Sequence, residues 1–331
     1  MSMPYKRRLP LSEEHLNEFR IIDMSTTTQH SDARTPDAPH KHRFRVQDYA
    51  VLLKPRVMSL VVFTAACGLL LAPGAIAIDT ALVAVICIAA GAGASGAINM
   101  WYDQDIDRVM TRTMNRPIPA GRLHPREALV FGTLLSFGAV GIMAHWVNEA
   151  AALLLAVTIL YYVFIYTMWL KRRTPQNIVI GGASGAFPPM IGWAAVTGGI
   201  DWGSLTLFAI IFLWTPPHSW ALALYRRGDY AAADVPMMPV VVGEKRTKLQ
   251  MLVYTALLIP ATLAPVALGI AGAFYGLVAL ALGVEFWRRL WRVWKSDDVM
   301  MARPLFLFSI LYLFVIFAAL LVDRLVFVPL V

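Results

Sequence analysis

Residues 81–98 read ALVAVICIAAGAGASGAI, an uncharged run of 18 residues, and residues 99–107 that follow read NMWYDQDID. The first run is long enough to cross the hydrocarbon core of a bilayer. Because lipid offers no hydrogen bonds to the backbone, a run of this kind is expected to be a helix. An apolar helix that ends in an asparagine and three aspartates predicts a membrane protein with a polar site at the end of a span.

The whole chain repeats this pattern of long apolar blocks. Of its 331 residues 58% are hydrophobic and 15% are charged, whereas soluble domains carry about a quarter charged residues. This composition disfavours a soluble fold and predicts an all-α polytopic membrane protein. The expected spans are nine in number, the eighth being the shortest: 57–73, 80–101, 125–146, 149–169, 176–198, 203–224, 249–270, 272–287 and 304–327.

The basic residues predict how these spans are oriented. Lys and Arg concentrate in the amino-terminal tail and in the alternate loops 102–124, 170–175, 225–248 and 288–303, and Arg324 is the exception. By the positive-inside rule, the tail and these loops face the cytoplasm, as expected for a bacterial inner-membrane protein. Residues 1–48 are expected to be a disordered tail, and residues 49–331 to form the transmembrane domain. The net charge of +8 follows from this topology and requires no nucleic-acid partner.

Three polar side chains at the end of the second span share one helical face. Asn99, Asp103 and Asp107 are four residues apart, so successive side chains advance by only about 40° around the helix. Asp105 is two residues out of step and points elsewhere. Two carboxylates and an amide oxygen are hard ligands that suit Mg²⁺, which usually shares its other positions with water and substrate phosphates. The pattern predicts a metal and diphosphate site.

Basic residues follow this stripe closely. Arg112, Arg116 and Arg122 are candidates for contacts with phosphate oxygens. Lys171 and Arg172, after the fourth span, support this only weakly, because cations just outside a membrane also serve as topology signals. The alternative is an interfacial helix end, where acids meet water and arginines meet lipid headgroups. The combined pattern favours the metal–diphosphate interpretation.

The sixth span and the loop after it hold a second polar group. Asp229 and Asp234 lie near basic residues, and if the second and sixth spans pack together, both acidic clusters face one cavity. Within the span, a Pro-Pro pair at 216–217 removes two backbone donors and is expected to break the helix where it lines a cavity. His218 is then a pocket residue that handles a proton, donates a hydrogen bond or ligates iron. A buried, merely hydrogen-bonded histidine is an equally open interpretation.

A diphosphate inside a membrane is expected to belong to a lipid. An isoprenyl diphosphate has an apolar tail and a polyanionic head, which match a membrane cavity with a charged mouth. Mg²⁺ and basic side chains would stabilise the leaving diphosphate as the C–O bond breaks, and an electron-rich acceptor would attack the allylic carbon. The sequence shows no Ser/His/Asp nucleophile arrangement and no glycine loop that cradles a phosphate.

These residues resemble a known family. Asn99-x-x-x-Asp103-x-x-x-Asp107 with Arg112 and Arg116 resembles the first motif of the intramembrane UbiA-type prenyltransferases. The match is closer to the haem-farnesylating branch of that family, in the segments NRPIPAG at 115–121, NIVIGG at 177–182, TPPH at 215–218 and DYAAADVPMMP at 229–239. The resemblance extends from about residue 49 to the eighth span.

The resemblance implies helices around a central cavity and Mg²⁺-dependent transfer of a farnesyl group from farnesyl diphosphate to a vinyl group of haem B, which becomes haem O. The metal-binding and catalytic residues that it implies are Asn99, Asp103, Asp107 and Asp229. The substrate-binding residues that it implies are Arg112, Arg116, Lys171, Arg172 and His218, with His218 contacting haem. The product also suggests a haem A synthase as a partner. Asp234, five residues after Asp229, and Ser219 depart from the family pattern.

Three other functions remain open at this point. A prenyltransferase acting on an aromatic quinone precursor would share the first motif but not the TPPH segment. A phospholipid phosphotransferase should carry an Asp-Gly-x-x-Ala-Arg element, which is absent from the sequence. An ion-coupled transporter predicts ionisable residues near the middle of spans, whereas nearly all the acids here lie at the ends expected to be cytoplasmic.

Overall fold

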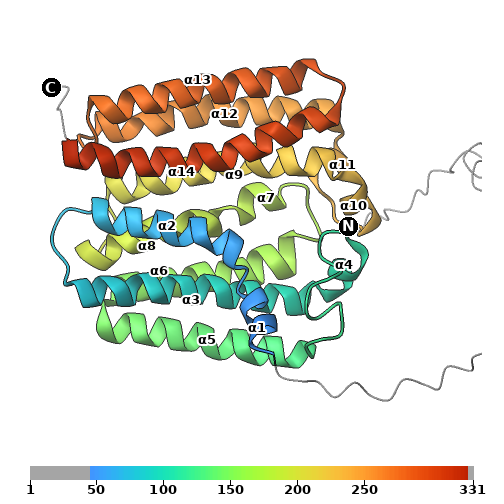
Figure 1. Cartoon of the computed structure of the whole chain (residues 1–331), viewed down its shortest axis with the longest axis horizontal. Coiled ribbons are helices and arrows are strands. Elements are labelled where there is room, and N and C mark those ends of the chain that lie inside the picture. The colour runs from blue at the N-terminus through green and yellow to red at the C-terminus, as the bar shows by residue number, and fades with distance from the viewer. Residues whose placement is uncertain (1–44, 327–331) are drawn as a thin grey trace, which may run out of the picture. The chain divides into compact units, whose positions relative to one another are not determined.

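The computed structural model describes residues 45–326, and this part of the chain contains helices but no strands (Figure 1). The helices in chain order are α1 (Val46–Leu52), α2 (Pro55–Leu71), α3 (Ile78–Tyr102), α4 (Gln104–Val109), α5 (Pro125–Trp146), α6 (Glu149–Leu160), the π-helix η2 (Tyr161–Leu170), α7 (Asn177–Gly181), α8 (Ala183–Thr197), α9 (Trp202–Tyr225), α10 (Arg227–Ala232), α11 (Met238–Val241), α12 (Glu244–Ala267), α13 (Ala273–Lys295), the 3₁₀ helix η3 (Val299–Met301) and α14 (Ala302–Val326). The tail expected over 1–48 lies outside the described residues up to residue 44, and residues 46–48 begin α1.

The long helices lie side by side and roughly parallel, as the expected membrane spans require (Figure 1). Among residues 45–326, seven helical segments are long and apolar enough to cross a membrane, and α1 with α2, bent by 55° at their junction, makes an eighth. The eighth expected span, 272–287, forms the first part of α13, which does not meet that criterion. It continues to Lys295 as a charged helix because Glu285 pairs with both Arg288 and Arg289, three and four residues on.

Small residues let the spans pack closely, as is common in membrane helix bundles. A side-chain carbon on Gly68 of α2 would lie 2.0 Å from the carbonyl oxygen of Pro189 in α8. The reverse also holds, since a side-chain carbon on Gly192 of α8 would lie 2.1 Å from the carbonyl oxygen of Ala65 in α2. Helices α2 and α8 are therefore in backbone contact. They join the apolar core formed with α3, α5 and α6 to the core formed with α9, α12, α13 and α14.

The expected break at the Pro-Pro pair is absent. Helix α9 continues through Pro216 and Pro217 from Trp202 to Tyr225. The two prolines nevertheless lack N–H groups, so the carbonyls of Phe212 and Leu213 lose their usual donors four residues on. Because the helix is unbroken here, only the side chains around His218 can indicate the expected cavity.

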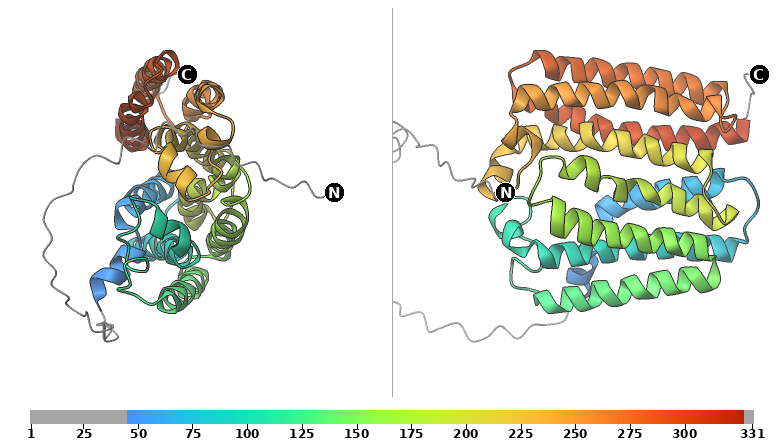
Figure 2. Two further views of the ribbon diagram at one scale, coloured as in Figure 1. Left: turned by 90° about the vertical axis from the view of Figure 1, so that its right-hand side faces the viewer. Right: turned by 180° about the vertical axis from the view of Figure 1, so that it is seen from behind.

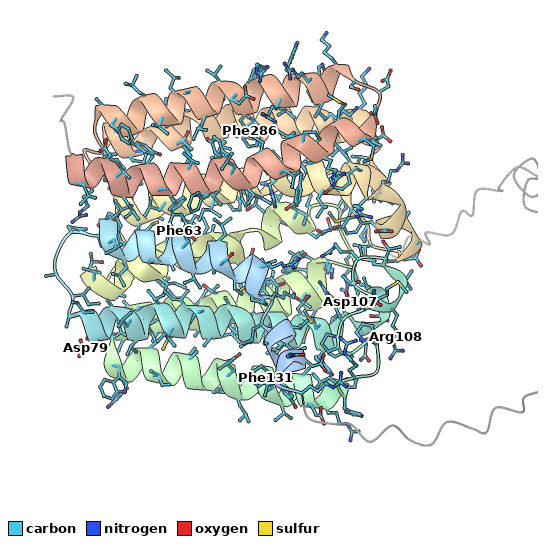
Figure 3. The ribbon with its side chains drawn as sticks, in the orientation of Figure 1. Phe63, Asp79, Asp107, Arg108, Phe131 and Phe286 are labelled. Atoms are coloured by element: carbon cyan, nitrogen blue, oxygen red, sulfur yellow. The ribbon has the colours of Figure 1, made fainter. Side chains whose placement is uncertain are left out.

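Short helices cover one end of the bundle. Helices α4, α10 and α11 lie together at the end that receives the carboxyl terminus of α3 (Figures 1 and 2). A small apolar core ties them together: Ile106, Met110, Ala223, Val235 and Met237. Figure 3 shows Asp79 and Asp107 at opposite ends of the bundle, with Arg108 beside Asp107. The two acidic segments of the sequence thus meet at one end, although α3 and α9 make no extensive contact.

Candidate active site

The polar stripe at the end of α3 lies inside the protein and not against lipid. Asn99 is in the last turn of α3, Asp103 is the residue that joins α3 to α4, and Asp107 is in α4; all three are buried. Asn99 Nδ2 donates to Asp103 Oδ2 at 2.7 Å. The backbone N–H of Asp107 donates to the carbonyl of Asp103 at 2.8 Å, so the helical rise continues across the junction. The three side chains share one buried stripe, as the spacing predicts.

Basic side chains from other segments compensate the buried carboxylates. Lys171, just after η2, donates from Nζ to Asp103 Oδ2. Arg116, in the loop after α4, donates to Asp107 Oδ2 at 2.7 Å. Arg172 donates to Asp103 Oδ1 at 3.3 Å. Three of the predicted phosphate contacts therefore lie beside the predicted metal ligands and bond to them.

Asp105 lies apart from this buried group. Its side chain is 62% exposed, and it pairs with the guanidinium of Arg172 through two bonds of 2.7 Å. The bidentate Arg172 contact holds the pKa of Asp105 below its usual value, and Asp105 in turn raises the pKa of Arg172. Asp105 points away from the stripe, as its position in the sequence predicts.

Lys54 belongs to the site, although the sequence analysis did not select it. It lies at the α1–α2 junction and its ammonium donates to Asn99 Oδ1 at 2.8 Å. The only signal in the sequence is a lysine immediately before Pro55 at the start of an apolar run. That signal is indistinguishable from an ordinary topology cation, so the contact with Asn99 is visible only in the folded protein.

The second acidic group joins the same end of the bundle. Asp229 of α10 accepts from Thr111 Oγ1 at 2.9 Å and has Arg226 Nη1 at 3.7 Å. Thr111 precedes Arg112, an exposed residue with no carboxylate partner among residues 45–326. Asp234 is exposed, with a left-handed backbone at φ 52°, after α10 has ended. Asp229 therefore faces the loop of the first cluster, whereas Asp234 does not take part.

Arg122, a candidate phosphate contact, pairs with a carboxylate outside the stripe. Its Nε donates to the buried Asp48 of α1 at 2.9 Å, and its Nη2 donates to the Asn115 carbonyl at 3.1 Å. Arg122 thus ties α1 to the loop after α4. Its carboxylate partner lies on α1 and not in the stripe, and a phosphate contact of Arg122 stays a prediction.

Tyrosines from η2 and α10 line the region between the two clusters. Tyr162 and Tyr166 have ring centroids 5.3 Å apart, and Tyr162 lies within electrostatic range of Asp103, Asp107 and Arg116. Burial raises the pKa of Tyr230. A π-helix such as η2 is often found at functional sites. The aromatic stretch 161–166 was not distinguishable in sequence from ordinary packing residues.

His218 lies between two aromatic rings in the interior of the bundle. Its ring stacks on Trp214 and on Phe306, with centroid distances of 4.2 Å and 4.7 Å. Nδ1 is 2.6 Å from Ser309 Oγ, which itself donates to the Phe306 carbonyl at 2.6 Å. If the single hydroxyl proton goes to the Phe306 carbonyl, Ser309 Oγ accepts from His218 Nδ1, and a neutral imidazole then has its lone pair on Nε2. No residue of the described range bonds to Nε2.

The donor set fits Mg²⁺ in part. Asn99, Asp103 and Asp107 offer hard oxygen atoms along consecutive helical turns, which is the ligand type that Mg²⁺ prefers. Within 45–326, no three Asp, Glu, His or Cys side chains come together closely enough to enclose one metal ion. Protein oxygens alone would therefore leave the coordination incomplete, so water or phosphate oxygens must supply the rest.

The chain is similar in sequence to proteins of one family over most of its length. A model of the UbiA prenyltransferase family matches residues 61–321. The protoheme IX farnesyltransferase of Parvibaculum lavamentivorans is 56% identical over 305 residues, which are 91% of this chain and 96% of that protein. The protoheme IX farnesyltransferase of Brucella suis is 58% identical over 285 residues, or 85% of this chain and 90% of that protein.

The fold is also similar to a solved membrane protein. A UbiA homologue from Archaeoglobus fulgidus, bound to GPP and Mg²⁺, has a TM-score of 0.60 and 16% identity. The match covers 82% of this chain and 99% of that one. At this level of identity the likeness concerns the arrangement of the helices alone.

Proposed function

The chain belongs to the UbiA prenyltransferase family, and on that premise we propose that it transfers a farnesyl group from farnesyl diphosphate to a vinyl group of haem B. The products are haem O and diphosphate. The observation that carries this conclusion is the identity of 56% and 58% to two protoheme IX farnesyltransferases over most of the chain. The protein is a multi-pass membrane protein, as its long apolar helices require.

The buried stripe is the proposed binding site of the diphosphate and its metal. Asn99, Asp103 and Asp107 would hold Mg²⁺ on one side, and Asp229 would do so from α10. Bound Mg²⁺ supplies Lewis-acid stabilisation of the negative charge on the leaving diphosphate. A family homologue bound to GPP and Mg²⁺ supports this assignment through its fold.

The basic residues of the site would bind the diphosphate by exchanging partners. Arg116, Lys171 and Arg172 each touch a carboxylate of the stripe. If the carboxylates held a metal instead, these cations would be available to phosphate oxygens beside it. Arg112, exposed and unpaired among the described residues, would reach the same anion from the loop. Fixed cations at a developing anion lower the barrier to C–O cleavage.

The reaction then requires an apolar interior and a positioned acceptor. Heterolysis of the allylic C–O bond leaves a farnesyl cation, which the terminal carbon of the haem vinyl group attacks to form a C–C bond. The cation left beside the porphyrin takes a hydroxyl from water, which releases a proton, and the hydroxyethylfarnesyl side chain results. We infer that His218 contacts haem through the free lone pair of Nε2, and that Trp214 and Phe306 fix the plane of the imidazole.

The orientation and setting of the enzyme are part of the proposal. The basic loops that follow α3, η2 and α9 share the end of the bundle where the stripe lies (Figure 1). By the positive-inside rule this end faces the cytoplasm, and the membrane is the bacterial inner membrane. The product, haem O, would be passed to a haem A synthase, the partner that its chemistry suggests.

An assay with two acceptors tests the proposed function. The purified protein, farnesyl diphosphate and Mg²⁺ are incubated with haem B or with an aromatic quinone precursor, and the products are identified by mass spectrometry. The proposal predicts farnesylated, hydrated haem and no prenylated aromatic acid. Product from the aromatic acid alone would refute the assignment of the acceptor and favour the other prenyltransferase activity.

A further inference from the structure

We propose that Lys54 is a further substrate-binding residue, which contacts the diphosphate of the prenyl donor from the α1–α2 junction. This inference rests on the proposed function in that the same buried stripe receives a diphosphate. It assigns a role to a residue that the sequence motifs do not include. The argument follows from the charge, the backbone and the packing of Lys54.

Among residues 45–326, Lys54 is the one cation bonded to the stripe that has no carboxylate partner. Arg116, Lys171 and Arg172 each have a carboxylate oxygen within 4.0 Å. Over residues 45–326, Lys54 has no such partner, and its ammonium makes a single hydrogen bond, to Asn99 Oδ1. An ammonium has three donors, so two remain for an anion. Lys54 is half-buried, and a cation partly withdrawn from water without a counter-ion is unfavourable unless a ligand supplies the missing charge.

The backbone directs this side chain inward. Lys54 has φ 51° and ψ 54°, a left-handed conformation that non-glycine residues seldom adopt. Pro55 then begins α2, and the two helices meet at 55°. On the neighbouring helix α3, Gly96 has no side chain. A carbon added to Gly96 would lie 3.4 Å from Lys54 Cδ and 3.6 Å from Lys54 Cε. The lysine stem therefore runs along α3 past Gly96 and reaches Asn99 three residues further on.

The contact with Asn99 places the ammonium where a metal-bound diphosphate must arrive. Asn99 Oδ1, which accepts from Lys54, is the oxygen that this amide would offer to Mg²⁺. If that oxygen turned to a metal, the Lys54 ammonium would lose the acceptor it has here, and a phosphate oxygen bound to the same metal would take its place.

Equilibrium binding of inorganic diphosphate tests this assignment without any turnover. Titration calorimetry with Mg²⁺ would compare the wild type with Lys54→Met, which keeps the apolar stem, and Lys54→Arg, which keeps the charge. The matched control is Arg56→Met, because Arg56 is an exposed cation two residues away. Lys54→Met should raise the Kd for diphosphate about ten-fold or more, as expected for the loss of a charged hydrogen bond. Lys54→Arg should lose less affinity, and Arg56→Met should stay within about two-fold.

Two outcomes would overturn the assignment. One is a Lys54→Met protein that unfolds more easily but binds diphosphate as the wild type does, which would make Lys54 only a support for Asn99 and the helix junction. The other comes from the wild type, so it holds even if the variants do not fold. Diphosphate with Mg²⁺ should suppress the acetylation of Lys54, which is measured by mass spectrometry. Unchanged acetylation would refute the contact between Lys54 and diphosphate.

These results are separable from the proposed function. Diphosphate binding and acetylation need neither haem nor a farnesyl group. If the wild type forms no farnesylated haem yet Lys54 governs diphosphate affinity, the acceptor is wrong and the Lys54 assignment stands. If the wild type forms farnesylated haem and Lys54→Met binds diphosphate normally, the proposed function stands and the Lys54 assignment is wrong.

Discussion

Substitution of Asp103 by asparagine tests the buried site, and the same substitution at the exposed neighbour Asp105 is its control. Asp103 is fully buried and accepts hydrogen bonds from Asn99 at 2.7 Å, from Arg172 at 3.3 Å and from Lys171. Asp103→Asn preserves the shape but removes the charge that compensates Lys171, whose side chain is 17% exposed. Breaking a buried ion pair costs about 3–5 kcal/mol. Since Lys171 keeps some hydration, we expect a loss of about 3 kcal/mol in unfolding free energy.

The loss of activity should be larger than that loss of stability explains. A preorganised group that stabilises developing charge contributes about 10²- to 10³-fold to turnover. Asp103 would also be a metal ligand, so we expect the rate of haem farnesylation by Asp103→Asn to fall at least about 10²-fold at temperatures where the protein is folded. The rate is measured by mass spectrometry of extracted haem, and the stability by thermal unfolding in detergent.

Asp105→Asn is the matched control. Asp105 shares Arg172 with Asp103 and lies two residues away, but it is 62% exposed. An exposed ion pair contributes at most about 1 kcal/mol, and the proposed site does not use Asp105. The activity of Asp105→Asn should therefore stay within about three-fold of the wild type, because exposed pairs have such small energies. The reasoning is refuted if the two variants lose activity equally, or if Asp103→Asn keeps a tenth of it.

Three other perturbations test separate parts of the account. His218→Ala should weaken haem binding, followed by the absorbance of haem, while the Kd for diphosphate is unchanged; equal haem titrations would exclude the haem contact. Removal of divalent ions by a chelator should stop product formation and added Mg²⁺ should restore it, whereas turnover that continues in chelator would contradict metal dependence. Arg122→Gln leaves the buried Asp48 without its ion pair, at 2.9 Å, and should lower the unfolding free energy by about 1–2 kcal/mol, because Arg122 is 37% exposed and the full cost of a buried pair is discounted. The Km of Arg122→Gln for farnesyl diphosphate should not change. A raised Km would show that Arg122 contacts the diphosphate.

The sequence predicts the long helices well because lipid imposes a simple rule. A segment either has enough apolar length to span or it does not, and backbone hydrogen bonding then requires a helix. Helix α13 shows where this rule stops. The expected segment 272–287 ends where charges begin, but the ion pairs of Glu285 with Arg288 and Arg289 carry the helix on to Lys295.

The site was predictable only where its residues lie close together in the chain. Asn99, Asp103 and Asp107 lie on one helical face at a fixed spacing, so their grouping follows from helical geometry. Lys54 is 45 residues from Asn99, and its contact depends on the left-handed turn before Pro55 and on the missing side chain at Gly96. The periodicity of residue types along the sequence cannot reveal such a contact.

Arg122 has another long-range contact that the sequence does not reveal. Its place in sequence, six residues after Arg116, resembles that of a phosphate ligand. Its actual partner, Asp48, is 74 residues away on a helix that the sequence analysis assigned in part to a tail. The expectation of a helix break at the Pro-Pro pair was wrong, since the loss of two N–H groups did not end α9. Neighbouring helices enclose that stretch on several sides, and the helix persists.

The central claim is that the buried stripe of α3 and α4 binds a metal and a prenyl diphosphate. A structure of the protein with Mg²⁺ and a non-hydrolysable farnesyl diphosphate analogue tests it most directly. The account predicts a metal ion on Asp103 and Asp107, with phosphate oxygens within hydrogen-bond distance of Arg116 and Lys171. An analogue bound at the opposite end of the bundle, near Asp79, or a stripe whose carboxylates still hold all their cations beside the bound analogue, would contradict it.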